Sequence, residues 1–347
     1  MDSSAAVSPM NPLDLDHILA STTGLWEELR GKRIFITGGT GFIGAWLLES
    51  FAWANDKLDL GASATVLSRN PITFAARMPH LAARSDLIFH EGDVRNFSFP
   101  AGSFDFVIHA GTTSSAPVEP LEMFATVVDG TRRVLELAAT RSTRKLLFVS
   151  SGAVYGRQPA GLTHVPEDYA GAPDPLDPAS AYGEGKRAAE LACALAGQKH
   201  GFETKIARGF AFVGPHLPLD AHFAIGNFIR DGLRGGPIRV RGDGTPFRSY
   251  LYAADLAAWL WTILLRGKSC HPYNVGSEEA LTIAQVARAA AAAFNPERIV
   301  IIDKQPVPGA PPQHYVPSTK RAREELGLQT RIALNDAIAR TILWTPK

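Results

Sequence analysis

A tyrosine and a lysine four positions apart are the residues best suited to chemistry in this 347-residue sequence. Tyr182 and Lys186 lie in a segment predicted to be helical, so both side chains share one helix face, about 5–6 Å apart at Cβ. A phenol with a pKa of about 10 is a poor acid or base at neutral pH, but a neighbouring cation lowers that pKa by about 1–3 units. We predict that Tyr182 exchanges a proton with an alcohol or sugar oxygen and that Lys186 supplies the charge that allows it.

A pair of serines precedes this helix and strengthens the prediction. A predicted strand at residues 146–149 ends in Ser150 and Ser151, and a loop rich in Pro, Gly and Asp leads on to Tyr182. Ser151 can hydrogen-bond the same oxygen while a hydride moves to or from a nicotinamide. The Tyr-x-x-x-Lys spacing alone is weak evidence for an active site. It becomes specific when such a strand and a dinucleotide-binding turn precede it in the sequence.

A glycine-rich turn of that kind lies near the N-terminus. An apolar run at residues 34–36 enters TGGTGFIG at residues 37–44, and a second apolar run follows. Strand, tight turn and helix in this order bring backbone N–H groups and the positive end of a helix onto a diphosphate. An ordinary turn is the alternative, but the strand and helix on either side favour a dinucleotide site. The residues expected to contact the cofactor, or to shape the turn around it, are Gly38, Thr40, Gly41, Phe42, Ile43 and Gly44.

The end of the next strand bears on the choice of cofactor. A free ribose 2′-hydroxyl is usually bound by an Asp or Glu about 20 residues after the glycines. Here the strand ends in Ser68 and Arg69, with no acid. Arg69 can pair with a 2′-phosphate, and Ser68 can add a hydroxyl. A solvated surface arginine is the alternative, yet the missing acid and the added base together favour NADP over NAD.

Two further strand ends offer contacts to the cofactor. After the third strand, Asp93 can reach an adenine amino group and Val94 lies beside it, although Asp93 could equally cap a turn. After the fourth strand, Ala110 and Gly111 are small enough for a close approach of the backbone. We interpret the preceding His109 as an interior histidine with its hydrogen bonds satisfied.

Strands alternate with helices from residue 32 onwards, which predicts a doubly wound, Rossmann-type α/β parallel sheet. Its ligands are expected beyond the carboxyl ends of the strands. Upstream, residues 1–30 are predicted to form a short helical extension, a docking or oligomer arm without chemistry. The predicted strands are residues 34–36, 65–67, 87–89, 106–108, 146–149 and 204–207, and the predicted helices are residues 45–53, 120–139 and 182–199.

Composition excludes several classes of function. The chain has 35 basic and 34 acidic residues and a net charge of +1, with no basic tract suited to nucleic acid. Two cysteines do not make a disulfide framework, and no segment approaches the run of about 20 apolar residues that spans a bilayer. We expect a soluble, cytoplasmic protein.

Taken together, these motifs resemble the extended short-chain dehydrogenase/reductases, in the nucleotide-sugar epimerase/dehydratase branch. The resemblance covers residues 32–344 and includes Arg208, Asn227 and Arg248 as well as the segments SSGAVYG, YGEGK and YNVGS. It implies a cofactor domain at residues 31–208 and a smaller mixed α/β domain at 209–347 that binds a nucleoside diphosphate sugar, with the chain returning to the first domain near 250–276. It also implies a homodimer formed through a four-helix bundle of helices 120–139 and 182–199.

Departures from the pattern of this branch narrow the reaction. Members that remove water across C5 and C6 carry an acid directly after the catalytic Ser or Thr, whereas Gly152 and Ala153 stand here, which disfavours a 4,6-dehydratase. Asparagines expected near the sugar and the cofactor loop are replaced by Val127 and Ala211. We expect a solvated basic face for the nearby arginines 230, 234, 239 and 241. The substrate-binding candidates are His216, His222, Asn227 and Arg248.

The leading hypothesis is an NADPH-dependent ketoreductase of a nucleotide-linked 4-keto-6-deoxy sugar, in surface-polysaccharide biosynthesis. Arg69 supports net reduction, because a net reductase exchanges NADPH, while an epimerase keeps a tightly bound NAD. The alternatives are a 4-epimerase, a reductase of a non-sugar ketone, and a catalytically inactive cofactor sensor. The intact set of Ser151, Tyr182 and Lys186 argues against the last of these.

Overall fold

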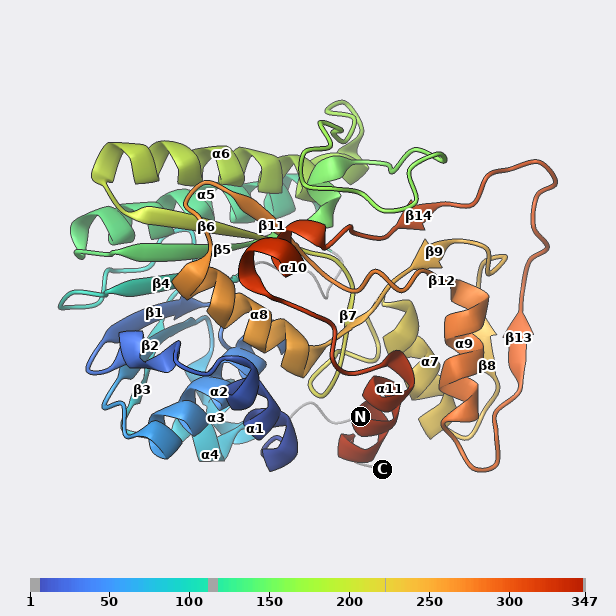
Figure 1. Ribbon diagram of the computed structural model, residues 1–347, viewed down its shortest axis with the longest axis horizontal. Helices are drawn as coiled ribbons and strands as arrows, with labels where there is room; N and C mark the ends of the chain where they lie inside the picture. Colours follow the sequence, from blue (N-terminus) through green and yellow to red (C-terminus); the bar gives the residue numbers. More distant parts are fainter. Residues whose placement is uncertain (1–6, 112–117, 222, 346–347) are drawn as a thin grey trace.

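A seven-stranded parallel sheet forms the centre of the computed structural model, which describes residues 7–111, 118–221 and 223–345 (Figure 1). The strand order is β11-β6-β5-β4-β1-β2-β3, so the chain winds outward in both directions from β1. This is the doubly wound α/β sheet predicted from the sequence. Its strands are β1 (Arg33–Thr37), β2 (Ser63–Ser68), β3 (Leu87–Glu91), β4 (Phe106–His109), β5 (Lys145–Ser151), β6 (Glu203–Gly209) and β11 (Pro272–Val275).

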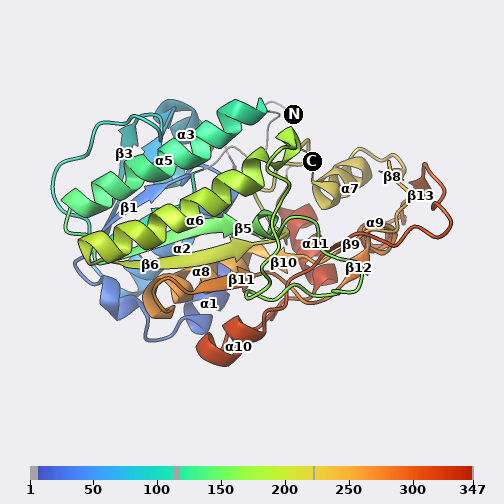
Figure 2. The same cartoon turned by 90° about the horizontal axis from the view of Figure 1, so that it is seen from above.

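Helices cover both faces of this sheet. Helices α5 and α6 lie side by side on one face, and α1, α2 and α8 lie on the other (Figures 1 and 2). Because both faces are covered, the central strands are continuous apolar runs, and Ile34, Phe35 and Ile36 of β1 are fully buried. The helices are α1 (Pro12–Ser21), α2 (Phe42–Leu58), α3 (Pro71–Arg77), α4 (Pro79–Ala82), α5 (Pro120–Thr140), α6 (Ala181–His200) and α8 (Ala253–Arg266).

The segment after β6 builds a second group of small elements beside the sheet (Figure 1). Strands β8 and β13 pair in parallel, β12, β9 and β14 form a three-stranded sheet, and β7 pairs with β10. Between β10 and β12 the chain returns to the main sheet through α8 and β11. The further elements are β7 (Phe212–Val213), α7 (Ala224–Leu233), β8 (Ile238–Val240), β9 (Phe247–Arg248), β10 (Leu251–Tyr252), β12 (Leu281–Thr282), α9 (Ile283–Ala292), β13 (Val300–Ile302), β14 (His314–Tyr315), α10 (Lys320–Leu326) and α11 (Leu334–Trp344).

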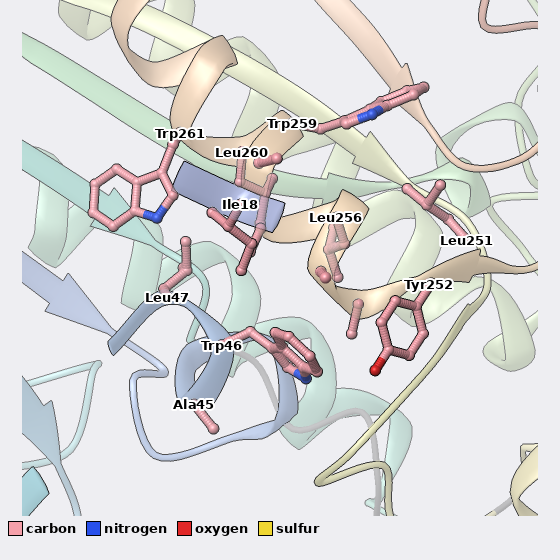
Figure 3. Packing of buried hydrophobic residues seen from close by; sticks show 14 of the residues in the cluster. Ile18, Ala45, Trp46, Leu47, Leu251, Tyr252, Leu256, Trp259, Leu260 and Trp261 are labelled. Carbon is pink, nitrogen blue, oxygen red and sulfur yellow. The ribbon is translucent and has the colours of Figure 1, made fainter. Parts of the chain in front are cut away.

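The N-terminal helices pack into the body of the molecule instead of forming an arm. Ile18 of α1, Trp46 of α2 and Trp261 of α8 belong to one apolar cluster, which Figure 3 shows from close by. Trp26, in the 3-10 helix Trp26–Leu29, lies with its ring centroid 4.9 Å from that of Trp261. The buried carboxylate of Asp14 accepts a hydrogen bond of 2.7 Å from the Tyr252 hydroxyl. The helices Pro12–Ser21 and Trp26–Leu29 thus pack against α2 and α8.

Within the described ranges, no helix combines the length and the apolar character that crossing a membrane requires.

Candidate active site

A cavity of about 1510 Å³ lies at the carboxyl ends of the central strands. Residues that end β1, β2, β5 and β6 line it on the side of the sheet, and residues of α7, β8 and β9 line it on the opposite side. The position agrees with the rule that ligands of doubly wound sheets sit beyond the strand ends. The cavity therefore has one wall from the sheet and one from the C-terminal elements.

The glycine turn forms one end of this cavity and fits a dinucleotide. Gly38 has a φ of +72°, and a Cβ there would lie 2.4 Å from the Ala110 carbonyl oxygen, so only glycine lets the ends of β1 and β4 touch. Helix α2 begins after Gly41 without a side-chain cap, which leaves its first N–H groups directed at the cavity. Gly44 packs beneath the turn and does not line the cavity. The predicted contact residues that do line it are Gly38, Thr40, Gly41, Phe42, Ile43, Val94, Ala110 and Gly111.

Ser68 and Arg69 line the same end of the cavity, where no carboxylate follows β2. Ser68 is buried, and its hydroxyl accepts a 3.2 Å hydrogen bond from the Asn70 amide. Asp93 also lines the cavity, but an Arg95 guanidinium 2.8 Å away holds the pKa of its carboxyl below the usual range. The Asp93 carboxylate at the cavity is therefore already paired with Arg95.

His109 is an interior histidine, as predicted. Its ring lies between the hydroxyls of Thr37, at 2.7 Å, and Thr131, at 3.1 Å. Burial, followed by the charge of Lys186, lowers the pKa of His109 to about 3, so the ring is neutral at physiological pH.

Ser151 and Tyr182 line the cavity, and Lys186 lies behind them. Lys186 is 1% exposed, and its Nζ donates to the Val149 carbonyl at 2.7 Å. The same Nζ is 5.7 Å from the centroid of the Tyr182 ring. Burial lowers the pKa of Lys186 to about 7, partly opposed by Glu190. The helix places Tyr182 at the cavity surface and the Lys186 ammonium on the buried side of its ring. From there the positive charge can stabilise the ionised phenol.

A buried network under Ser150 escaped the sequence analysis. Glu190 accepts from the Ser150 hydroxyl at 2.6 Å and forms an ion pair of 2.6 Å with Arg208. Arg208 also donates to the Tyr155 hydroxyl at 2.9 Å, and Tyr155 donates to Asn274 at 2.8 Å. The signal for Glu190 was its position, one helical turn after Lys186 on the same face. The network ties α6 to β6 and β11 just below the candidate catalytic residues.

Tyr315 is a second tyrosine in the cavity, and it too was missed. His314 and Tyr315 form the short strand β14, which pairs with β9. The Tyr315 hydroxyl lies 3.5 Å from Ser151 Oγ, and burial raises the pKa of Tyr315 to about 12. A two-residue strand has too few positions for an alternating pattern, so nothing in the sequence pointed to it.

Gly152 makes room for this tyrosine. A Cβ at Gly152 would lie 2.7 Å from the Phe210 ring and 2.9 Å from the Tyr315 hydroxyl. The position that carries an acid in C5,C6-dehydrating members of the branch is therefore filled by aromatic side chains from elsewhere in the chain.

The substrate-binding candidates fall in different parts of the cavity. Asn227 and Arg248 line the wall made by the C-terminal elements. His216 also lines the cavity, and its ring packs against Trp344, with ring centroids 4.4 Å apart. Burial lowers the pKa of His216 to about 3, so it is neutral near pH 7. The prediction for His222 falls outside the described residues.

The arginines near Asn227 do not all form a solvated face. Arg230 lines the cavity with only 14% of its side chain exposed, and it donates to Asn227 at 2.8 Å. The expectation is therefore wrong for Arg230, because helix α7 turns this residue inward next to Asn227. Arg239 and Arg241 also border the cavity, while Arg234 is 57% exposed.

Comparison with known proteins adds to this geometry. A profile of the NAD dependent epimerase/dehydratase family matches residues 34–276, which span the glycine turn, Ser151, Tyr182 and Lys186. The chain belongs to this family. UDP-glucuronic acid decarboxylase 3 of Arabidopsis thaliana is 30% identical over 312 residues, a match that covers 88% of this chain and 86% of the plant protein. The protein is therefore an enzyme that acts on nucleotide sugars, in a family described as NAD-dependent.

Solved structures of epimerases have the same fold. UDP-glucose 4-epimerase of Thermotoga maritima, solved with UDP-glucose, superposes with a TM-score of 0.73 and 20% identity, covering 90% of this chain and 98% of that one. A UDP-glucuronic acid 4-epimerase variant of Bacillus cereus, solved with a fluorinated UDP-sugar acid and NAD, gives 0.75 and 21%, with 90% and 98% covered. At these identities, the epimerase/dehydratase fold is what the chains share.

Proposed function

We propose that this family member is an NADPH-dependent 4-ketoreductase of a nucleoside diphosphate 4-keto-6-deoxy sugar, in surface-polysaccharide biosynthesis. The observation that carries the proposal is the end of β2, where Ser68 and Arg69 line the cavity and no carboxylate follows. A 2′-phosphate is compatible with this end of the strand, and a cofactor that exchanges suits net reduction. The lack of a titratable side chain at Gly152 and Ala153 further disfavours dehydration.

NADPH, when bound against the glycine turn, supplies the hydride that the carbonyl carbon at C4 receives. Tyr182 gives its phenolic proton to the carbonyl oxygen, so that the ketone gains one hydride and one proton and becomes an alcohol. Ser151 donates a hydrogen bond to that oxygen and holds it beside Tyr182. The Lys186 ammonium lies behind the ring and stabilises the phenolate that remains, until a proton from solvent restores it.

The second wall of the cavity supplies the site for the diphosphate sugar in this proposal. The Arg248 guanidinium offers two parallel donors to the diphosphate. Asn227 has its amide oxygen bonded to Arg230, which leaves its NH₂ group to donate to a phosphate. We assign residues 31–208 to the cofactor and residues 209–347 to the nucleotide sugar on this basis.

A 4-epimerase that keeps NAD is the second candidate, because epimerases solved with UDP-sugars have the same fold. Cofactor release separates the two candidates. We expect purified protein to hold less than stoichiometric NAD and to oxidise NADPH when a 4-keto-6-deoxy sugar nucleotide is added. If the purified protein holds stoichiometric NAD, interconverts UDP-sugars and oxidises no NADPH, the reductase proposal is wrong and the protein is an epimerase. UDP-glucuronic acid belongs in the same panel because of the plant relative.

We also propose that two copies associate through α5 and α6. These helices pack closely on each other, and they expose Leu121, Leu191 and Leu195, which are 73%, 61% and 57% exposed. Exposed leucines on adjacent helices fit a four-helix interface. We expect the mass in solution, measured by light scattering, to be twice that of the chain, and Leu191→Glu with Leu195→Glu to return it to one chain.

A further inference from the structure

Besides Arg69, another arginine lies beside the glycine turn, and no pattern in the sequence predicted its position there. Arg77 is the last residue of α3, a short helix that starts directly after Arg69 and Asn70. The Asn70 side chain caps this helix by accepting from the Thr73 amide at 2.9 Å. The helix leads the chain back to the turn, so Arg77 Nη2 donates to the Thr40 carbonyl at 2.5 Å. Both Arg69 and Arg77 line the cavity at this end.

Arg77 has no carboxylate partner among the residues that the structure describes. Its Nε is buried without a hydrogen-bond partner, and burial lowers the pKa of Arg77. The acids of neighbouring elements are engaged elsewhere. The Glu49 carboxylate lies 2.7 Å from His80. Asp86 forms an ion pair of 2.8 Å with Arg84, the next arginine along the chain. The half-buried Arg77 guanidinium therefore carries a positive charge that the folded chain does not neutralise.

An uncompensated guanidinium in a cavity favours binding of an anion, and its planar fork suits phosphate. The diphosphate of a dinucleotide belongs at the N-terminus of α2, where backbone N–H groups receive it. Arg77 lies at Thr40 of the glycine turn, on the helix that follows β2. In doubly wound dinucleotide sites the end of β2 faces the adenosine ribose, where the 2′-phosphate is the anion that distinguishes NADP from NAD.

We propose that Arg77 binds the 2′-phosphate of NADP(H) together with Arg69, and that it sets the preference for NADP over NAD. The inference rests on the proposed function, which names NADPH as cofactor. The bond to the Thr40 carbonyl fixes the guanidinium against the turn and leaves Nη1 for the phosphate. Arg69, at the exposed end of β2, then closes on the phosphate from the solvent side.

Calorimetric titration of the full-length protein with NADP⁺ and NAD⁺ tests the inference directly. For Arg77→Met, we expect the dissociation constant for NADP⁺ to rise about tenfold to a hundredfold, the range for a lost hydrogen bond to a charged group. The constant for NAD⁺ should change less than about threefold. Adenosine 2′,5′-bisphosphate should lose affinity in parallel with NADP⁺, while 5′-AMP should not. Arg77→Lys keeps the charge without the fork, and its loss should be smaller.

Arg133→Met is the matched control, because Arg133 also donates to a backbone carbonyl, that of Phe97 at 2.8 Å, and lies outside the cavity. It should leave both constants unchanged. Equal weakening of NAD⁺ and NADP⁺ in Arg77→Met would overturn the inference, since Arg77 would then only hold the turn. A wild-type preference for NAD⁺ would overturn both the inference and the choice of cofactor. A preference for NADP⁺ that depends on Arg77, in a protein that reduces no keto sugar, would uphold the inference and overturn only the reaction.

Discussion

Buried and half-buried cations occur at both ends of the central sheet, but three of those at the carboxyl ends lack the carboxylate partners found at the amino ends. Near the amino ends of β5 and β6, Lys145 pairs with Glu28 at 2.6 Å, and Lys205 pairs with Glu203. Each also donates to a backbone carbonyl, that of Leu265 at 2.8 Å or that of Gly267. At the carboxyl ends, Lys186, Arg248 and Arg77 are in no ion pair with any residue that the structure describes.

The difference separates structural charges from charges kept for ligands. A buried cation with an acid and a carbonyl beside it is satisfied when the chain folds, and removing it leaves groups unpaired. A buried cation without an acid costs stability in the free protein and gains its partner on binding. Such cations at the strand ends therefore indicate where an anionic ligand or a developing phenolate lies, without any knowledge of the reaction.

Lys186→Met should produce the largest effect on activity. Without the ammonium behind the phenol, we expect NADPH oxidation to fall about a hundredfold to ten-thousandfold, the range for general acid–base catalysis. The free energy of unfolding in urea should not fall, because a buried unpaired charge has been removed. Lys205→Met should show the reverse, with activity retained and about 1–3 kcal/mol of stability lost. A destabilised but active Lys186→Met would contradict the comparison.

Arg208→Met should produce the largest loss of stability. It leaves Glu190 buried without its ion pair, which costs about 3–5 kcal/mol in unfolding experiments. Adding Glu190→Gln should restore part of that loss, because the uncompensated carboxylate is then gone. A double variant no more stable than Arg208→Met would show that packing, and not charge, holds α6 to β6.

Arg248→Met should weaken binding of a nucleoside diphosphate about tenfold to a hundredfold in calorimetry, with no loss of thermal stability. Burial lowers the pKa of Arg248, and no carboxylate in the described part of the chain forms an ion pair with it. Arg234→Met is the control, since Arg234 is 57% exposed, pairs with Asp220 at 3.4 Å and lies outside the cavity. Equal losses of affinity in both variants would point to a general electrostatic effect.

The neutral histidines predict the smallest effect, a decline of stability at mildly acidic pH. His109 and His216 have folded pKa values of about 3, below the unfolded value of about 6.5, so the unfolded chain binds more protons between these values. Their contribution is therefore complete above pH 6.5 and is lost as the pH falls. From pH 6.5 to 5.5, each histidine should account for a loss of about 1 kcal/mol. Urea titrations of His109→Gln at both pH values should show a shallower decline.

The sequence predicted the parts of the site that rest on local patterns. The glycine turn, Ser151 and the Tyr182–Lys186 pair each follow from a strand or helix beside them, and all lie where the sheet brings them together. Asn227 and Arg248 were found through resemblance, and they line the opposite wall. Apolar runs also predicted β1 to β6 of the main sheet and the helices α2, α5 and α6, but not β11 or α8.

The residues that were missed depend on contacts between distant segments. Tyr315 meets Ser151 across 164 positions of sequence, and Arg77 meets Thr40 through a helix too short for a clear period. The N-terminal helices were expected to be an arm because short amphipathic segments carry no information about what they pack against. Trp26 and Ile18 are buried only because α8 comes back to cover them.

The tie between Asp14 and the C-terminal elements has a consequence for synthesis on the ribosome. Asp14, in α1, is held by Tyr252 and by Arg340 of α11, which lies 326 positions away. The carboxylate emerges early and waits without its arginine until almost the whole chain has been made. A chain that stops before α11 keeps the Tyr252 bond but leaves the Asp14 carboxylate without its arginine, and an uncompensated buried charge is destabilising. The last helix therefore completes the charge balance of the first one.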